Sequence, residues 1–432
     1  MDTLSTRGHE IKDFKNVLAC AFNQQMKRAY DAKRNPTGII NLGTSENKLM
    51  FDVIEEKLQS LPAVPESLTH YGSFHGVPGL KKAIAKMLEH FMKPIEPIKD
   101  CNIIVFNGCG PVVEALGMLL AERGDAFMTT APYYGAFKDD LCRRGGVDIV
   151  PVYLSNEIAN DESKPYELSM SKMESAYQQA CKEGKRVRAF ILCNPYNPVG
   201  SIFSEKEVRD CLSFAHKHSL HVIVDEIYLL SVYKEGHKMP NVLSLQGIPD
   251  PERTHVVWGF SKDMCVSGFR AGAIYTVNKD LCGALKSMAY LQSTSLLTQH
   301  YLEHMISDLD WLDHVFLPTN QRRLQECSNI VCDALRSVDV PYVDGIAGLF
   351  IWADFRKLLL SPTFEEEWEI FNEFMNYKLY ITPGQAFYYN EPGWFRIIFA
   401  TRPSILQLGM ERLKSCVNHL RQRADLQKLS IA

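Results

Sequence analysis

The run from Trp258 to Gly272 holds the side chains of this 432-residue chain that are best suited to chemistry. Lys262 directly follows Ser261 and stands eight residues before Arg270. Such an amine could form a Schiff base with an aldehyde while Arg270 and Ser261 bind a phosphate, because a guanidinium is a planar and permanently charged fork of donors. Pyridoxal 5'-phosphate (PLP) carries both groups. Taken alone, the run also fits a solvated surface lysine, so its meaning depends on partners elsewhere.

The first partner is a carboxylate at the end of a strand. The β-branched run Val222–Val224 predicts a short, buried parallel strand. Asp225 then lies at its carboxyl end, where ligands bind in open α/β sheets. This carboxylate could keep a pyridine nitrogen protonated, which makes the ring an electron sink, and Tyr228 could donate to the ring oxygen. The alternative is a strand that ends in an acidic helix cap.

Two turns that follow apolar runs supply further donors. Asn197 lies in an Asn-Pro turn, and its amide suits the same ring oxygen, although a plain loop is the alternative. Gly108, Cys109 and Gly110 precede a helical pattern with Pro111 in its first turn. Backbone amides there could approach an anion at the positive end of the helix.

Strand-like and helix-like segments alternate along the chain, which predicts a mostly parallel sheet flanked by helices. The strands are expected at Ile103–Phe106, Ala126–Thr129, Asp148–Val152, Ala189–Leu192, Val222–Val224, Val256–Trp258 and Ala271–Tyr275. The segment Ser204–His218 is a typical amphipathic helix between two of them. Beyond Thr298 the chain is helix-rich, and a strand pair near Leu349–Ala353 and Trp394–Phe399 indicates a smaller C-terminal domain.

Composition limits the function classes. The net charge of −4 and the lack of a basic stripe argue against nucleic acid as a partner. The 12 cysteines show no CxxC pair or zinc spacing, which favours reduced thiols in the cytoplasm and no metal site. No apolar run approaches the roughly 18 residues that span a bilayer, so we expect no membrane association.

In this combination and order, the segments resemble the fold-type I PLP enzymes of the class I/II aminotransferase superfamily. Within that superfamily they are most similar to the aminocyclopropane carboxylate synthases and the synthase-like proteins. The likeness runs from about Gly38 to Cys416. The stretches that carry it are Gly38–Leu49, Phe74–Gly79, Pro132–Gly135, Asn194–Gly200, Asp225–Tyr228, Ser261–Asp263, Ala347–Asp354, Thr363–Glu367 and Pro392–Arg396.

The resemblance implies an α/β fold with a seven-stranded, mostly parallel sheet in a large PLP-binding domain at residues 49–298. It implies a smaller α+β domain at 299–432 and an arm at 1–48 that packs on the small domain and on a dimer partner. It further implies a homodimer with shared active sites and a small amino acid substrate.

The same resemblance implies roles for particular residues. Around the cofactor it places Lys262 as the covalent link, Asp225 at the pyridine nitrogen, Asn197 and Tyr228 at the ring oxygen, Tyr134 against the ring face, and Arg270, Ser261, Gly108, Cys109 and Gly110 at the phosphate. At the substrate it places Arg396 on the α-carboxylate, with Glu46 and Ser45 nearby.

Three positions depart from the family pattern. Phe74 replaces a tyrosine that reaches the phosphate of the neighbouring subunit's cofactor, Gly259 replaces a serine, and the Cys109–Pro111 run lacks a threonine hydroxyl. Fewer hydroxyl donors predict weaker cofactor binding, because each neutral hydrogen bond contributes roughly 0.5 to 1.5 kcal/mol. We therefore expect aminotransferase or elimination (lyase) chemistry rather than efficient ring closure. The alternative is a catalytically weak PLP-binding or interaction protein that keeps the fold.

Overall fold

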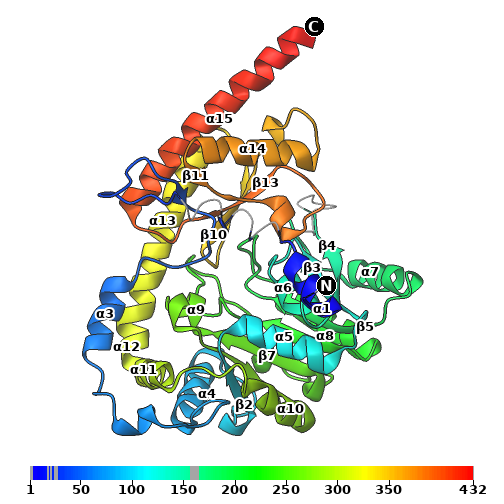
Figure 1. Ribbon diagram of the computed structural model, residues 1–432, viewed down its shortest axis with the longest axis vertical. Helices are drawn as coiled ribbons and strands as arrows, with labels where there is room; N and C mark the ends of the chain where they lie inside the picture. Colours follow the sequence, from blue (N-terminus) through cyan, green and yellow to red (C-terminus); the bar gives the residue numbers. More distant parts are fainter. Residues whose placement is uncertain (1–2, 17–18, 20–21, 24–27, 156–164, 432) are drawn as a thin grey trace.

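The computed structural model describes residues 3–16, 19, 22–23, 28–155 and 165–431. A seven-stranded sheet lies at the centre of the larger part of the molecule (Figure 1). In spatial order its strands are β2 (Ile103–Phe106), β8 (Gly272–Tyr275), β7 (Thr254–Gly259), β6 (His221–Asp225), β5 (Val187–Cys193), β3 (Ala126–Ala131) and β4 (Asp148–Tyr153). Strand β8 runs antiparallel to both neighbours, and the remaining pairs are parallel. The predicted fold class is thereby confirmed.

Helices cover both faces of this sheet, which is why its central strands are mostly apolar and buried, whereas the edge strand β4 exposes Asp148 and Tyr153. On one face α5, α6 and α10 share a hydrophobic core with the strands. On the other face α4, α7 and α8 do so. These helices are α4 (Pro78–Met92), α5 (Cys109–Leu120), α6 (Phe137–Cys142), α7 (Met170–Lys182), α8 (Glu205–Lys217) and α10 (Lys279–Ala289).

Two helix starts agree with the sequence pattern. Helix α8 begins after Ser204, whose hydroxyl accepts from the backbone of Glu207 while the Glu207 side chain returns to the Ser204 backbone. This reciprocal capping box satisfies two backbone donors at the helix end. Helix α5 begins at Cys109, with Pro111 in its first turn, so its free backbone donors follow Gly108 directly.

A second, antiparallel sheet forms the smaller part of the molecule. Its order is β12 (Thr382–Pro383), β13 (Trp394–Ile398), β10 (Phe350–Asp354) and β9 (Tyr342–Val343). Near it, β1 (Ile40–Asn41) pairs in parallel with β11 (Leu379–Tyr380), so an early segment of the chain joins this part. The boundaries at residues 48 and 298 stay a prediction.

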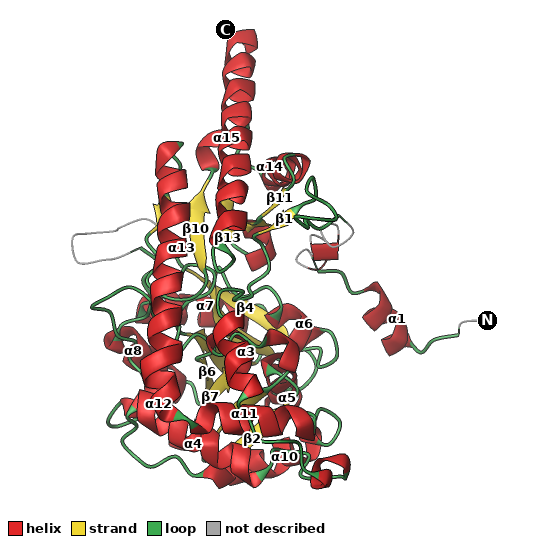
Figure 2. Ribbon diagram, turned by 90° about the vertical axis from the view of Figure 1, so that its left-hand side faces the viewer, coloured by secondary structure: helices red, strands yellow, loops and turns green. Residues whose placement is uncertain are grey.

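The remaining helices connect and flank these two parts. They are α1 (Thr6–Asp13), α3 (Phe51–Gln59), α9 (Phe260–Asp263), α11 (Leu296–Ser307), α12 (Leu309–Trp311), α13 (Leu317–Ser337), α14 (Phe364–Asn376) and α15 (Pro403–Ile431). Helix α15 extends well beyond the body of the molecule, and α13 runs beside it in both views (Figures 1 and 2).

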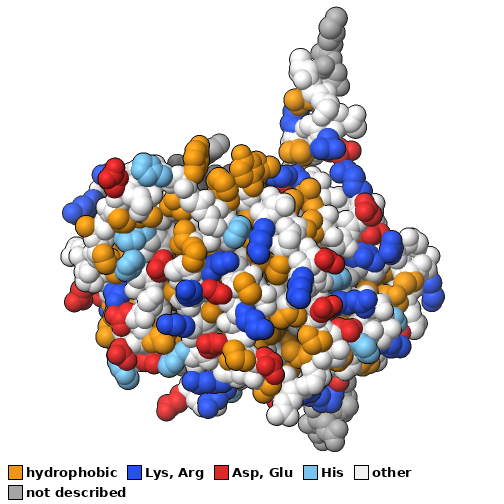
Figure 3. Space-filling model, turned by 90° about the horizontal axis from the view of Figure 1, so that it is seen from below, with side chains coloured by type: hydrophobic (Ala, Val, Ile, Leu, Met, Phe, Trp, Pro, Cys, Tyr) orange, Lys and Arg blue, Asp and Glu red, His pale blue; other side chains and the backbone are white. Residues whose placement is uncertain are grey.

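Two surface properties bear on possible partners. Within the described part of the chain, every helix is too short or too polar to cross a membrane. Figure 3 shows basic and acidic side chains interspersed across the face that it presents, without a region of one sign.

Candidate active site

A cavity of about 570 Å³ lies at the carboxyl ends of the central strands. Asp225 comes from the end of β6, Lys262 from α9 after β7, and Arg396 from β13 of the smaller sheet. The sequence-predicted residues that line it are Ser45, Glu46, Cys109, Gly110, Tyr134, Asn197, Asp225, Tyr228, Ser261, Lys262, Arg270 and Arg396. Gly108 lies just outside this lining. Asp225, Asn197 and Lys262 meet because they follow strands whose ends share one edge of the central sheet. Ser45, Glu46 and Arg396 come from the smaller part of the molecule.

The Lys262 amine points into the cavity, where its Nζ donates to the backbone carbonyl of Ser45. Burial, together with the nearby positive charge of Arg396, lowers the pKa of Lys262 to about 8. Both effects favour the neutral amine, which is the nucleophilic and basic form.

Asp225 is a buried carboxylate, only 6% exposed. It accepts one backbone hydrogen bond, from the nitrogen of Ile227 at 3.3 Å. Burial raises its pKa to about 6, although that bond and a thiol hydrogen bond from Cys193 act in the other direction. Among the described residues no cation forms an ion pair with it. A protonated ring nitrogen would supply the missing partner.

Arg396 is a buried cation, which needs an anionic partner where Asp225 needs a cationic one. It is 2% exposed, and its guanidinium donates to Asn197 Oδ1 at 2.9 Å and to the Gly43 carbonyl at 2.8 Å. Its Nε has no hydrogen-bond partner within the described part of the chain. Burial lowers the pKa of Arg396. Because an unpaired buried charge is costly, this guanidinium is well placed to receive a carboxylate.

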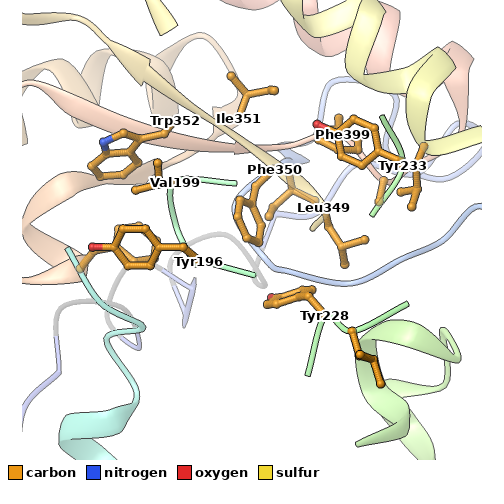
Figure 4. Close-up of a cluster of buried hydrophobic side chains, with 14 of the residues drawn as sticks. Tyr196, Val199, Tyr228, Tyr233, Leu349, Phe350, Ile351, Trp352 and Phe399 are labelled. Atoms are coloured by element: carbon orange, nitrogen blue, oxygen red, sulfur yellow. The ribbon is translucent and has the colours of Figure 1, made fainter. Parts of the chain in front are cut away.

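Asn197 and Tyr228 both carry hydrogen-bond donors that face the cavity. Since Asn197 uses its oxygen to accept from Arg396, the Nδ2 end of the amide is left for donation. The Tyr228 hydroxyl lies 2.9 Å from Ser45 Oγ. Burial raises the pKa of Tyr228, so it remains protonated. Its ring packs edge-on against Phe350 of β10 at 5.4 Å, and Figure 4 shows the two side chains together.

The start of α5 and Arg270 form a candidate phosphate site. Gly108 has a φ of +107°, and a Cβ atom there would lie 2.6 Å from Arg270 Nη2. The positive φ favours glycine, and a Cβ atom there would also displace the flexible end of the Arg270 side chain. Ser267 also lines the cavity, and its hydroxyl donates to the Ser261 carbonyl at 2.8 Å. The sequence analysis did not assign Ser267 to the site. The available signal was its place three residues before Arg270.

The structure shows that Gly259 does more than remove a serine hydroxyl, because its missing side chain leaves room for a neighbouring sulfur atom. Its φ of −161° suits any residue, yet a Cβ atom there would lie 2.5 Å from Cys109 Sγ. The same sulfur lies 3.4 Å from the Trp258 carbonyl, to which the thiol donates. Serine at position 259 and cysteine at position 109 therefore compete for one volume, and the two departures from the family pattern are physically coupled.

Several lining residues carried no sequence signal. They include Asn16, Thr44, Asp139, Asp140, Cys193 and Tyr380. Burial raises the pKa of Asp140 to about 7, and the neighbouring Asp139 adds to this rise. Asp139 and Asp140 lie in α6, Cys193 and Tyr380 are the last residues of β5 and β11, and Asn16 and Thr44 lie outside helices and strands. Their approach to the cavity depends on packing rather than on local pattern.

The donor set of the cavity fits PLP. Asp225 could pair with the ring nitrogen, Asn197 and Tyr228 with the ring oxygen, and Lys262 with the aldehyde. The start of α5 with Arg270 would hold the phosphate, because free backbone amides and a guanidinium both bind oxyanions. A cationic ring nitrogen would pair with Asp225, and a substrate carboxylate would pair with Arg396.

Comparison with known proteins agrees with this reading. Residues 37–413 match the sequence profile of the family "Aminotransferase class I and II". The 1-aminocyclopropane-1-carboxylate synthase-like protein 1 of Bos taurus is 40% identical over 424 residues, which are 98% of this chain and 84% of that protein. A human relative named probable inactive 1-aminocyclopropane-1-carboxylate synthase-like protein 2 is 37% identical, over 99% of this chain and 76% of its own length.

More distant relatives extend the likeness. The 1-aminocyclopropane-1-carboxylate synthase 9 of Arabidopsis thaliana is 33% identical, over 94% of this chain and 88% of its own length. The aspartate aminotransferase of Thermus thermophilus, solved with maleate, shares the fold with a TM-score of 0.78 and 17% identity, over 96% of this chain and 100% of that one. The chain therefore belongs to the class I and II aminotransferase family, and its cofactor is PLP.

Proposed function

We propose that the protein is an enzyme that acts at the α-carbon of an amino acid, by amino-group transfer or by elimination of a side-chain substituent. One observation carries this proposal. The amine of Lys262, with its lowered pKa, shares a cavity with two buried charges, Asp225 and Arg396, that lack ion-pair partners within the described chain.

The chain's own groups supply the binding and proton-transfer steps. When bound, PLP supplies an electron sink for negative charge that develops on the α-carbon. Asp225 holds the proton on the ring nitrogen, and Asn197 and Tyr228 donate to the ring oxygen. Arg396 binds the α-carboxylate and so orients the α-hydrogen. Lys262 Nζ takes that hydrogen as a proton, acting as the general base.

The arrangement depends on both parts of the molecule. Arg396 comes from the smaller sheet, and Lys262 comes from the larger part. The Gly43–Glu46 segment lies between them, since the Gly43 carbonyl accepts from Arg396 and the Ser45 carbonyl accepts from Lys262. A substrate carboxylate on Arg396 would thus be held against the lysine by contacts that close the cavity to water.

Exchange of the α-hydrogen tests this function without knowledge of the final product. The holoprotein is incubated with a panel of amino acids in deuterated water, and proton loss is followed by NMR. The wild type and Lys172→Ala should exchange at least one substrate, whereas Lys262→Ala should not. Lys172 is a suitable control because it is partly buried, bonds a backbone carbonyl at 2.9 Å and lies outside the cavity lining. Parallel assays of ammonia and 2-oxo acid release separate elimination from transfer.

A second candidate is a PLP-binding protein with weak or no catalysis. The departures from the family pattern at Gly259 and Cys109, beside the candidate phosphate site, favour this candidate, as does the relative named probable inactive. This reading predicts bound PLP and no α-hydrogen exchange with any amino acid, which is the outcome that would overturn the first proposal.

We further propose a homodimer in the cytoplasm. An exposed aromatic patch supports the dimer: Tyr71 is 95% exposed, Leu291 is 84% exposed, and Phe74 packs edge-on against Tyr290 at 5.0 Å. Such a patch is typical of a protein interface. Tyr71→Glu should shift the protein toward monomers in sedimentation. The location is supported by the unpaired state of all cysteines that the structure describes.

A further inference from the structure

Asp263 directly follows the proposed cofactor lysine, yet it lies outside the cavity and is fully buried. Its carboxylate accepts three hydrogen bonds. Oδ1 accepts from the Ser231 hydroxyl at 2.6 Å, and Oδ2 accepts from the Leu230 backbone at 3.0 Å and from the Trp258 indole at 2.9 Å. A fully buried carboxyl group is costly without hydrogen-bond partners, and these three donors offset that cost while they fix the position of Asp263.

The three donors belong to two segments that flank the site. Trp258 lies in β7, the strand that leads to Lys262. Leu230 and Ser231 follow Tyr228, and the Ser231 backbone donates to the Tyr228 carbonyl at 3.0 Å. Asp263 therefore ties the turn that carries the lysine to the turn that carries the tyrosine.

The network continues into the smaller part of the molecule. The Ser231 carbonyl accepts from the Gly348 backbone at 2.9 Å. Gly348 lies two residues before the start of β10, whose Phe350 packs against the Tyr228 ring (Figure 4). On the cavity side, Ser45 contacts both reactive groups, since its carbonyl accepts from Lys262 and its hydroxyl bonds Tyr228. Lys262 and Tyr228 are thus held together from the cavity side and from the opposite side.

We propose that Asp263 is a positioning residue that sets the distance of the Lys262 amine from Tyr228 and Asp225. This inference rests on the proposed role of Lys262. It predicts that PLP affinity depends on the shape and the hydrogen-bond acceptors of residue 263, and not on its charge. Asparagine can replace Asp263 in this role, because its side-chain oxygen can accept from Leu230 and Trp258 while its amide nitrogen donates to the Ser231 hydroxyl.

The test compares Asp263→Asn, Asp263→Ala and Trp258→Phe with wild type. Glu207→Ala is the matched control, because Glu207 also accepts from a serine hydroxyl and two backbone nitrogens but lies outside the cavity lining. Each apoprotein is titrated with PLP, and borohydride reduction with peptide mapping gives the fraction of cofactor attached at position 262. Thermal unfolding of each apoprotein reports stability separately.

We expect Asp263→Ala to weaken PLP binding by about tenfold or more, a loss typical of outer-shell partners of functional groups. Asp263→Asn should restore affinity and attachment at Lys262, and Trp258→Phe should be intermediate. Glu207→Ala should unfold earlier but bind PLP normally. If Asp263→Ala fails to fold, the PLP affinities of Asp263→Asn and Trp258→Phe relative to wild type still test the proposal.

Two results would overturn the proposal. One is an Asp263→Asn variant that binds PLP as poorly as Asp263→Ala, or worse than Trp258→Phe, because charge rather than position would then matter. The other is wild-type PLP affinity and attachment in Asp263→Ala or Trp258→Phe. Failure of wild type itself to attach PLP at Lys262 would instead refute the proposed function.

Discussion

Replacement of Gly259 by serine should not, by itself, improve cofactor binding, although it adds a hydroxyl beside the candidate phosphate site. The new Cβ would lie 2.5 Å from Cys109 Sγ. Either the sulfur must rotate and lose its hydrogen bond to the Trp258 carbonyl, or the start of α5 must move. Overpacking of this kind costs typically about 1 to 3 kcal/mol. A hydrogen bond to a charged phosphate contributes about 1.5 to 3 kcal/mol, so the two effects approximately cancel.

Removal of the sulfur separates these two effects. Cys109→Ala alone should destabilise the apoprotein by about 1 kcal/mol, similar to loss of one buried methyl group. In the double variant Gly259→Ser/Cys109→Ala the clash with the sulfur is removed, and only the closer backbone contact with the Ala271 carbonyl at 3.3 Å remains, while the phosphate bond is kept. PLP affinity of the double variant should then exceed that of wild type by roughly tenfold or more, the equivalent of about 1.4 kcal/mol.

The assay is a double-mutant cycle. Urea unfolding of the four apoproteins gives the steric coupling, expected at about 1 to 3 kcal/mol in favour of the double variant. PLP titration of the same four proteins gives the gain from the hydroxyl. Additive effects in both measurements, or tighter PLP binding in Gly259→Ser alone, would refute the claim that positions 259 and 109 compete for one volume.

Three further outcomes follow from the charges of the site. Because burial lowers the pKa of Lys262 to about 8, its neutral fraction and the rate of PLP association with the apoprotein should rise about tenfold between about pH 7 and pH 9; stopped-flow absorbance measures this, and a flat profile contradicts it. Asp225→Asn should retain PLP but lose α-hydrogen exchange, since a neutral amide cannot hold the ring nitrogen protonated; near-normal exchange by NMR would make Asp225 a structural cap. Arg396→Leu should raise the Michaelis constant for every substrate by about 10- to 100-fold, from loss of a charge-assisted pair of about 1.5 to 3 kcal/mol; an unchanged constant would place the carboxylate site elsewhere.

Local pattern was enough to predict the central sheet and much of the cavity lining. Short β-branched runs such as Val222–Val224 fit buried strands of a parallel sheet, and the polar residues that directly follow them share one edge of that sheet. Asp225 and Asn197 could therefore be assigned to one site from their places after such strands. The amphipathic pattern of Ser204–His218 likewise predicted α8.

The contacts that orient these groups depend on segments far apart in the chain. Ser45 meets Lys262 and Tyr228 because β1 joins the smaller part of the molecule, which no local pattern of residues 40–46 encodes. The collision of Cys109 with any side chain at Gly259 likewise arises only when α5 packs against β7.

Residue types and their spacing thus determined which chemistry this protein could perform. Only the tertiary structure decided which groups touch, because steric exclusion and burial of charge act between neighbours in space rather than along the chain.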